Sequence, residues 1–320
     1  MPSVMTFYRF VRLTNLTELR DSLERAAAAR RLKGTILLAG EGINATLAGP
    51  RRALDEFRAE LGRRGAFAGM RVRYSSAAPD NPVFYRLKVR IKAEIVRLDQ
   101  PGVAPDRRTG EHVDPRRWNA LLDDPSVLVL DTRNGYEIAI GTFPGARDPG
   151  TRAFRELPDY VRRHLDPSRH PRVAMFCTGG IRCEKASAWL LEQGFESVYQ
   201  LDGGILSYLE NVAAEENRWK GECFVFDQRV SVAPDLGQGS FEQCYACRRP
   251  LSAEDMASTA YQPGVRCPHC LNEHDDARRD GFRERRRQVE LAARRGELHL
   301  GVPMEHAESH PASPTAPAPQ

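Results

Sequence analysis

The sequence predicts an α/β protein in three parts, and three observations indicate this. Strand-like runs with a period of two alternate with helix-like runs with a period near 3.6 through residues 1–98 and again through residues 123–217. A segment rich in Pro, Gly and charge, residues 99–122, separates these regions as a linker. Two Cys-x-x-Cys pairs then fall within residues 218–300, a pattern typical of a small metal-binding region. Residues 301–320 are mostly Pro, Ala and Ser, which predicts a disordered tail.

The composition is that of an ordinary globular protein, with 41% hydrophobic and 28% charged residues in a chain of 320. The net charge of +4 is small, so a polyanionic partner must be argued from where the charges lie. No apolar run approaches the roughly 18 residues of a membrane span, and the first residues lack the pattern of a signal peptide. Seven cysteines, an odd number, suit metal and catalytic use in a reducing compartment. We therefore expect a cytoplasmic protein without membrane contact.

The first region, residues 1–98, follows the order β-α-β-β-α-β. The strand patterns lie at residues 6–11, 35–38, 44–48 and 71–74, and the helical faces are marked by Leu16, Leu19, Leu23, Leu54, Phe57 and Leu61. This order predicts a ferredoxin-like fold, in which two helices cover one face of an antiparallel sheet and the other face stays open.

A row of four cations follows these elements. Residues 86–97 alternate sharply, so a strand there would place Arg86, Lys88, Arg90 and Lys92 on one face. Like charges at every second position repel one another, and an anionic partner would relieve that repulsion. The alternative is a solvated strand face.

Cys177 lies on a predicted strand-to-helix turn. An apolar run, residues 173–176, ends at Cys177, and Arg182 opens a helical pattern that stops at Gly194. The four residues between them supply backbone N–H groups: Thr178, Gly179, Gly180 and Ile181. These groups and the positive end of the helix can lower a thiol pKa from about 8.5 to about 3.5–7.5. We therefore predict a thiolate stabilised by the loop, with Arg182 bracing it. The alternative, a buried structural cysteine, explains neither the two glycines nor the arginine.

The length of this loop separates two chemistries. Phosphate-binding cysteine loops of the Cys-x5-Arg type enclose four oxygens, whereas the spacing from Cys177 to Arg182 is one residue shorter. The shorter loop fits a single sulfur, which disfavours phosphatase activity and favours persulfide chemistry.

Two further residues are candidates for the same site. Asp131 ends the predicted strand over residues 127–130, and the ligand sites of parallel sheets lie at the carboxyl ends of strands. It can accept hydrogen bonds from Arg133 or Arg182, or it simply ends the strand; we include it with Cys177 and Arg182 in the catalytic set. Cys183 is a possible second, resolving thiol, although we favour a packed one.

The two Cys-x-x-Cys pairs predict a structural zinc site. Its ligands would be Cys244, Cys247, Cys267 and Cys270, and the nineteen residues between the pairs suit a tetrahedral four-cysteine site. An arginine-rich helix is predicted over residues 280–296, with more arginines just before it. Its arginines either contact phosphates or pair with Glu284 and Glu290 on a solvated helix.

The central region resembles the rhodanese family, whose loop cysteine carries a persulfide. The resemblance covers residues 123–211 and includes the motifs Asp131-Thr132-Arg133, Gly145-Ala146-Arg147, the Cys177 loop and Asp202-Gly203-Gly204. Taken from residue 6 to 270, the chain resembles the rhodanese-related tRNA wobble-uridine hydroxylases. That wider resemblance includes the segments at residues 40–44, 154–158, 177–185, 203–210 and 221–227.

The wider resemblance implies oxygen-dependent 5-hydroxylation of the wobble uridine in tRNA, with Cys177 as the catalytic residue and molecular oxygen as co-substrate. The basic elements outside the central region favour RNA as the partner. We find no flavin or haem motif and no two-His-one-carboxylate iron pattern. Two alternatives remain open. One is a sulfurtransferase that carries a persulfide on Cys177 to tRNA or a small thiol; the other is a non-catalytic scaffold, against which the intact Cys177 counts.

Overall fold

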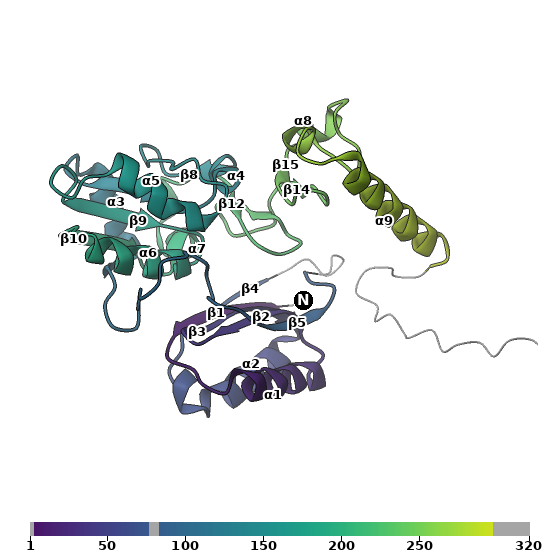
Figure 1. Cartoon of the computed structure of the whole chain (residues 1–320), viewed down its shortest axis with the longest axis horizontal. Helices are drawn as coiled ribbons and strands as arrows, with labels where there is room; N and C mark the ends of the chain where they lie inside the picture. Colours follow the sequence, from purple (N-terminus) through teal and green to yellow (C-terminus); the bar gives the residue numbers. More distant parts are fainter. Residues whose placement is uncertain (1–2, 77–82, 297–320) are drawn as a thin grey trace, which may run out of the picture.

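The computed structural model describes residues 3–76 and 83–296. The predicted tail, residues 301–320, lies outside these ranges. Figure 1 shows three parts: an N-terminal sheet with two helices beneath it, a central α/β domain, and a C-terminal region that ends in one long helix. Among the described residues, no helix combines the length and the apolarity that crossing a membrane requires.

The N-terminal domain has the predicted β-α-β-β-α-β order with one strand added. Its elements are β1 (Ser3–Phe10), α1 (Leu16–Ala29), β2 (Lys33–Ala39), β3 (Gly42–Gly49), α2 (Arg51–Gly62), the 3-10 turn η1 (Gly65–Phe67), β4 (Val72–Ser76) and β5 (Leu87–Ile91). The sheet order is β4-β1-β3-β2-β5; the first four strands are antiparallel and β5 runs parallel to β2. Leu23, Ile36, Leu54 and Phe57 are buried in one core between the helices and the sheet. The ferredoxin-like fold is therefore confirmed.

The strand predicted over residues 86–97 is wrong beyond Ile91. The backbone N–H of Lys92 still donates to the Leu38 carbonyl at 2.8 Å, but β2 ends at Ala39. Beyond β5, side-chain carboxylates accept the backbone hydrogen bonds that a neighbouring strand would otherwise accept. The Glu41 carboxylate accepts from the N–H of Ile95, and the Glu94 carboxylate accepts from the N–H groups of residues 98 and 99. The chain consequently turns out of the sheet.

The predicted open face of this sheet is also partly covered. The Tyr8 hydroxyl on β1 donates to Glu184 of the central domain at 3.2 Å. On the β4 side, Arg71 bonds Asp202 at 2.8 Å, and Arg73 bonds Glu210. The sequence pattern of the N-terminal domain could not predict this cover, because the residues that contact the open face belong to the central domain.

The central domain contains a parallel sheet in the order β6-β10-β9-β7. Its elements are β6 (Glu111–Val113), α3 (Pro115–Asp123), β7 (Leu128–Asp131), α4 (Gly135–Ile138), β8 (Gly141–Thr142), η2 (Phe154–Glu156), α5 (Leu157–His164), β9 (Arg172–Phe176), α6 (Ile181–Glu192), β10 (Ser197–Leu201), α7 (Gly204–Asn211) and η3 (Ala214–Glu216). Trp189 belongs to the core on one face of the sheet, and Trp118 and Tyr208 belong to the core on the other. A sheet buried on both faces explains why β7 and β9 read as continuous apolar runs.

The central domain extends beyond the predicted limits at both ends. β6 and α3 lie largely in the expected linker, yet β6 pairs with β10, and the Trp118 side chain on α3 is fully buried. Asp114 caps α3 with Pro115 at its first position, a helix-start signal that the linker-like composition obscured. At the other end, β11 (Lys220–Gly221) pairs with β8, and β12 (Cys223–Phe224) pairs with β13 (Ser231–Val232). Cys223 is buried in this core, and burial raises its pKa to about 12, so it stays a thiol.

The C-terminal region contains β14 (Glu242–Gln243), β15 (Pro250–Leu251), α8 (Ala253–Ala257), η4 (Pro268–Cys270) and α9 (Asp276–Arg294). The predicted arginine-rich helix is therefore present but begins earlier than residue 280. Its start is set by the Asp275 side chain, which accepts the N–H of Arg278. Figure 1 shows α9 extending away from the two larger domains.

Candidate active site

Cys177 lies between the last residue of β9 and the first residue of α6, at the carboxyl end of the parallel sheet. The N–H of Gly180 donates to the Cys177 sulfur at 3.1 Å. Gly180 has φ of 98°, in the left-handed region where a residue with a Cβ is strained. The start of α7 fixes the loop from behind: the N–H of Ile205 donates to the Cys177 carbonyl at 2.9 Å. A Cβ on Gly204 would lie 2.4 Å from that carbonyl oxygen, so only glycine allows this approach.

The electrostatics of the loop favour a thiolate at Cys177. Burial opposes ionisation, but the Cys183 thiol, the Arg182 charge and the N–H groups of both residues lower the pKa of Cys177 to about 6. Burial and the neighbouring Cys177 raise the pKa of Cys183 well above its ordinary value. Cys183 therefore stays a thiol, and it is this thiol that helps to lower the pKa of the neighbouring Cys177. The Cys183 sulfur also lies 3.6 Å from the Thr132 hydroxyl.

Arg182 is held by a buried carboxylate that the sequence analysis missed. Its two terminal nitrogens each lie 2.7 Å from an oxygen of Glu137, which is fully buried at the end of α4's first turn. Burial opposes the charge of Arg182, but Glu137 and Cys177 raise its pKa, so it remains a cation beside the thiolate. The available signal was the Asn134-x-x-Glu137 spacing of a capping box just before an apolar residue.

Asp131 takes one of its two predicted partners. Its carboxylate accepts from Arg133 at 2.6 and 2.9 Å and from the Thr142 hydroxyl at 2.9 Å. Among the described residues, it has no hydrogen bond to Arg182 or Cys177. Asp131 instead fixes Arg133, whose guanidinium lies 5.0 Å from the centre of the Trp219 ring. Among the described residues, the hydrogen-bond partners of the Asp131 carboxylate are therefore Arg133 and Thr142 rather than residues of the Cys177 loop.

Two clusters of side chains surround the loop, and the Cys177 side chain itself has no exposed surface. On one side, the Thr178 hydroxyl donates to the Phe224 carbonyl at 3.4 Å, and Phe224 packs on Tyr136. On the other side, Tyr8 of the N-terminal domain lies against Gly180, since a Cβ there would meet its hydroxyl at 2.7 Å. Burial and Glu184 raise the pKa of Tyr8 well above its ordinary value, so this hydroxyl stays protonated.

A cleft of about 950 Å³ lies between the N-terminal and central domains and reaches the loop at Gly179. Its lining includes side chains of both signs: Arg9, Arg71, Arg73, His112, Glu184 and Asp202. Because Arg71 and Arg73 are paired with Asp202 and Glu210, the cleft is polar rather than strongly cationic.

The four cations predicted on one strand face lie at and just beyond β5. Lys88 is half-buried, and Arg86, Arg90 and Lys92 are exposed. Burial lowers the pKa of Lys88, and so do the nearby charges of Arg86, Arg90 and Arg248. Among the described residues, no side-chain hydrogen bond or ion pair involves the four cations of the predicted row, Arg86, Lys88, Arg90 and Lys92. The row is therefore an uncompensated cluster, which Arg248 of the C-terminal region joins.

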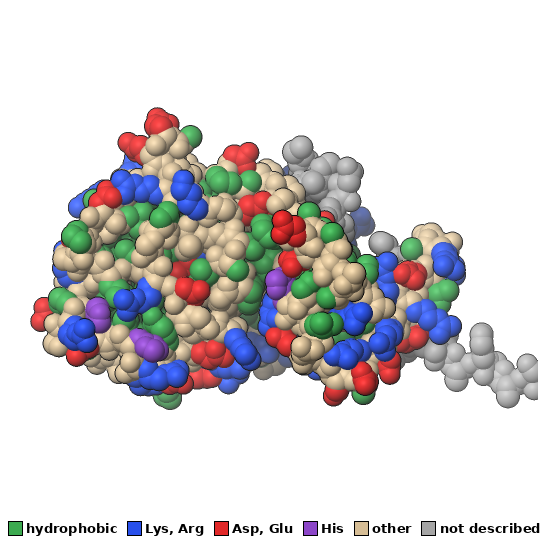
Figure 2. Space-filling view, turned by 90° about the horizontal axis from the view of Figure 1, so that it is seen from above, with side chains coloured by type: hydrophobic (Ala, Val, Ile, Leu, Met, Phe, Trp, Pro, Cys, Tyr) green, Lys and Arg blue, Asp and Glu red, His purple; other side chains and the backbone are tan. Residues whose placement is uncertain are grey.

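Four of the seven arginines within α9 pair with acids on the same helix, Arg279 with Asp276 among them. Arg283 pairs with Asp280, Arg286 with Glu290, and Arg287 with Glu284. Figure 2 shows Lys and Arg side chains interspersed with Asp and Glu on this side of the molecule. The alternative of a solvated, ion-paired helix is the better description.

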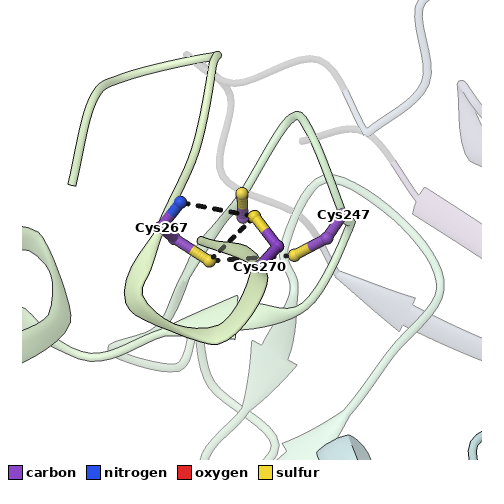
Figure 3. A group of neighbouring side chains, drawn as sticks. Cys247, Cys267 and Cys270 are labelled. Carbon is purple, nitrogen blue, oxygen red and sulfur yellow. Dashed lines mark hydrogen bonds between the residues drawn. The ribbon is translucent and has the colours of Figure 1, made fainter. Parts of the chain in front are cut away.

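The four cysteines of the predicted metal site lie together, and Figure 3 labels three of them, Cys247, Cys267 and Cys270. All four sulfurs, including that of Cys244, lie within 4.8 Å of one another. The Cys267 sulfur is 3.8 Å from that of Cys247 and 3.6 Å from that of Cys270. A tetrahedral site with Zn–S bonds of about 2.3 Å has sulfurs about 3.8 Å apart, so the cluster fits a metal such as zinc. His269, a possible substitute ligand, instead bonds Asp255 at 3.0 Å.

Comparison with known proteins identifies two of the three parts. Residues 2–95 match the family model described as a UPF0176 acylphosphatase-like domain, and residues 114–211 match that of the rhodanese-like domain. The chain thus combines an acylphosphatase-like domain with a rhodanese-like domain.

Three solved structures are each similar to part of the chain. A rhodanese-like domain from Anabaena is 23% identical with a TM-score of 0.29, covering 35% of this chain and 80% of that one. An acylphosphatase from Bacillus subtilis is 17% identical with a TM-score of 0.23, covering 28% and 98%. A rhodanese-related protein from Thermoplasma volcanium is 21% identical with a TM-score of 0.26, covering 31% and 91%.

Proposed function

We propose that this protein is an oxygen-dependent hydroxylase of the wobble uridine in tRNA and that Cys177 is its catalytic residue. The observation that carries the proposal is a buried cysteine in a rhodanese-like domain whose pKa is lowered to about 6. The N–H of Gly180, the N–H groups of Arg182 and Cys183, and the Arg182 charge surround its sulfur. The motif resemblance along the chain supplies the specific reaction. In that reaction, one atom of O₂ is inserted into the C5–H bond of uracil to form a C5–OH group. The other oxygen atom is reduced to water by two electrons and two protons from an external reductant.

The loop residues have distinct roles in this proposal. Cys177 presents a thiolate or its persulfide, and the N–H of Gly180 and the charge of Arg182 stabilise the anion. Glu137 is a positioning residue, since it acts through Arg182. Cys183 is a hydrogen-bond donor to the reactive sulfur rather than a resolving thiol.

The four C-terminal cysteines would hold a structural zinc ion. Four thiolates fill a tetrahedral shell and leave no position for a substrate or water. The metal would join the two cysteine pairs of the C-terminal region. Apart from the cysteines, its small core contains the buried Leu251 and the partly buried Ala246, Met256 and Tyr261. We assign it no part in the reaction.

The tRNA partner is supported by charge and by shape. The cluster of Arg86, Lys88, Arg90 and Lys92 lacks acidic partners among the described residues, so phosphates would relieve its repulsion. The cleft beside Gly179 leaves room for an unpaired nucleotide next to the loop. A tRNA substrate would place the protein in the cytoplasm.

Sulfur transfer is the second candidate, and the short loop favours it. Four residues between Cys177 and Arg182 enclose a single sulfur, and a persulfide there could be passed to tRNA or to a small thiol. A non-catalytic scaffold is disfavoured, because a scaffold needs neither the thiolate nor the buried Arg182–Glu137 pair.

Nucleoside analysis separates these possibilities. Cells lacking the gene are complemented with the wild type or with Cys177→Ser, and their tRNA nucleosides are measured by mass spectrometry. We expect 5-hydroxyuridine and its derivatives to disappear on deletion and to return only with the wild type. Loss of thiolated nucleosides instead would establish sulfur transfer to tRNA, and unchanged nucleosides would exclude both tRNA reactions.

A further inference from the structure

Phe226 is an aromatic side chain exposed to solvent. Its exposed fraction is 63%, and Ile91 at 37% is the other large apolar side chain exposed in the part of the chain that the structure describes. Exposure of a single apolar residue is ordinary on a protein surface and indicates nothing by itself. Phe226 is distinguished by two further observations: its loop is firmly held, and its ring lies next to Arg182.

Several polar contacts fix the loop that carries Phe226. Asp227 and Arg229 form a two-point ion pair at 2.6 and 2.9 Å, and Arg229 also bonds the Ser75 hydroxyl of the N-terminal domain at 2.9 Å. The N–H of Val225 donates to the Val230 carbonyl at 2.9 Å, closing the turn. Phe226 is thus presented from a turn anchored to both domains.

The position of the ring relates it to the reactive loop. Phe226 packs edge-on against Phe224, with ring centres 5.1 Å apart and planes at 83°. The guanidinium of Arg182 lies over the Phe226 ring, 5.7 Å from its centre. The exposed ring therefore lies directly outside the arginine that stabilises the Cys177 thiolate.

We propose that Phe226 is a stacking platform for an unpaired base of the RNA substrate, placed beside the Arg182 side of the Cys177 loop. This inference rests on the proposed function, because it requires RNA as the substrate. Single-stranded RNA is recognised largely by stacking its unpaired bases on aromatic side chains, and stacking tolerates any base because every base has a π-face. A small thiol acceptor has no flat ring to stack. Phe226 is a positioning residue and takes no part in the chemistry.

Removal of the ring should weaken binding without changing the thiolate. Loss of one stacked base corresponds to about 5- to 150-fold in affinity, about 1–3 kcal/mol. The dependence of binding on salt should keep its slope, because the same number of phosphates stays neutralised. The rate of Cys177 alkylation should also keep its pH profile.

The test measures tRNA binding to the full-length protein at several salt concentrations with three variants. Phe226→Ala removes the ring, Phe226→Leu keeps an apolar side chain without a π-face, and Phe226→Trp keeps a π-face. We expect weaker tRNA binding by Phe226→Ala and Phe226→Leu, and wild-type affinity or better with Phe226→Trp. The salt slope should be unchanged in all three variants. In activity measurements, Phe226→Ala and Phe226→Leu should show an increase in KM that exceeds any fall in kcat.

Each other outcome overturns the inference in a recognisable way. Wild-type binding by Phe226→Ala overturns stacking but leaves the proposed function intact. Wild-type binding by Phe226→Leu with weak binding by Phe226→Ala means an apolar contact, as a protein partner would make. An altered alkylation profile means that Phe226 acts through Arg182. Failure of the wild type to bind tRNA overturns the RNA substrate and the inference together.

Discussion

At the scale of single residues, the reactivity of Cys177 depends on a balance between burial and charge. Burial alone would keep the thiol protonated, and the nearby Arg182 and Cys183 reverse that effect. Arg182 in turn keeps its charge in a buried position because Glu137 supplies a carboxylate with matching two-point geometry. Arg182, supported by Glu137, and Cys183 thus together set the protonation state of the Cys177 sulfur.

The first prediction concerns the pH dependence of this sulfur. Because the folded state lowers the pKa of Cys177 to about 6, its thiolate forms as pH rises through 6, whereas an ordinary thiol ionises near about 8.5. Alkylation by a small neutral reagent, followed by peptide mass spectrometry, should give a half-maximal rate near pH 6 at Cys177. Cys223, with a pKa of about 12, is the internal comparison and should stay unmodified in the folded protein. A half-maximal rate at Cys177 above pH 8 would contradict the assignment.

The second prediction concerns Glu137. Glu137→Gln leaves the Arg182 cation buried without its counter-charge, and breaking a buried pair typically costs about 3–5 kcal/mol. Urea unfolding should show that the free energy of unfolding falls by about 3–5 kcal/mol. The matched control is Glu192→Gln, an exposed position on α6, where the change should stay within about 0.5 kcal/mol. Equal effects in the two variants would mean that the pair does not stabilise the loop.

At the scale of elements, α6 connects the reactive loop to the N-terminal domain. Its Lys185 is almost fully buried and pairs with Glu41 at the β2–β3 turn and with Glu94 beyond β5. The preceding residue, Glu184, accepts the Tyr8 hydroxyl of β1. The same helix therefore follows the Cys177 loop and contacts the N-terminal domain. These contacts fix the position of the loop relative to the cleft beside Gly179.

The third prediction concerns β5. Lys88→Glu with Arg90→Glu should weaken tRNA binding and reduce the salt slope by about 0.7–0.9 units for each phosphate that the variant no longer neutralises. The control double variant, Arg25→Glu with Arg63→Glu, makes the same charge change at exposed positions on or just after α1 and α2, on the other side of the sheet. Binding measured against salt should separate the two. If both doubles have the same slope, β5 carries only a solvated face.

At the scale of the whole molecule, local patterns predict the elements but not their contacts. The run of residues 173–176, the glycines after Cys177 and the paired cysteines are short-range signals, so the sequence alone places β9, its loop and the metal ligands. The role of Glu137 depends on a side chain that meets Arg182 only after folding, and the burial of Tyr8 depends on another domain. The strand predicted through residue 97 is wrong for a similar reason, since Glu41 and Glu94 capture the backbone there.

The fourth prediction concerns the C-terminal region. Metal analysis of protein purified without chelator should find one zinc per chain. Because structural zinc contributes about 10–16 kcal/mol to folding in small peptides, chelation should expose residues 242–270 to hydrogen exchange first. The central sheet should stay protected, and added zinc should restore the original pattern. Absence of metal, or no change in exchange after chelation, would refute the site.

Under the proposed function, Cys177 directs oxygen from O₂ to uridine. The most direct measurement grows gene-deleted cells, complemented with the wild type or with Cys177→Ser, under molecular oxygen labelled with its heavy isotope, and weighs the tRNA nucleosides. We expect 5-hydroxyuridine derivatives from wild-type cells to be heavier by one labelled oxygen atom, and cells with Cys177→Ser to contain none. Hydroxylated nucleosides without the label, or labelled ones in the Cys177→Ser cells, would contradict it.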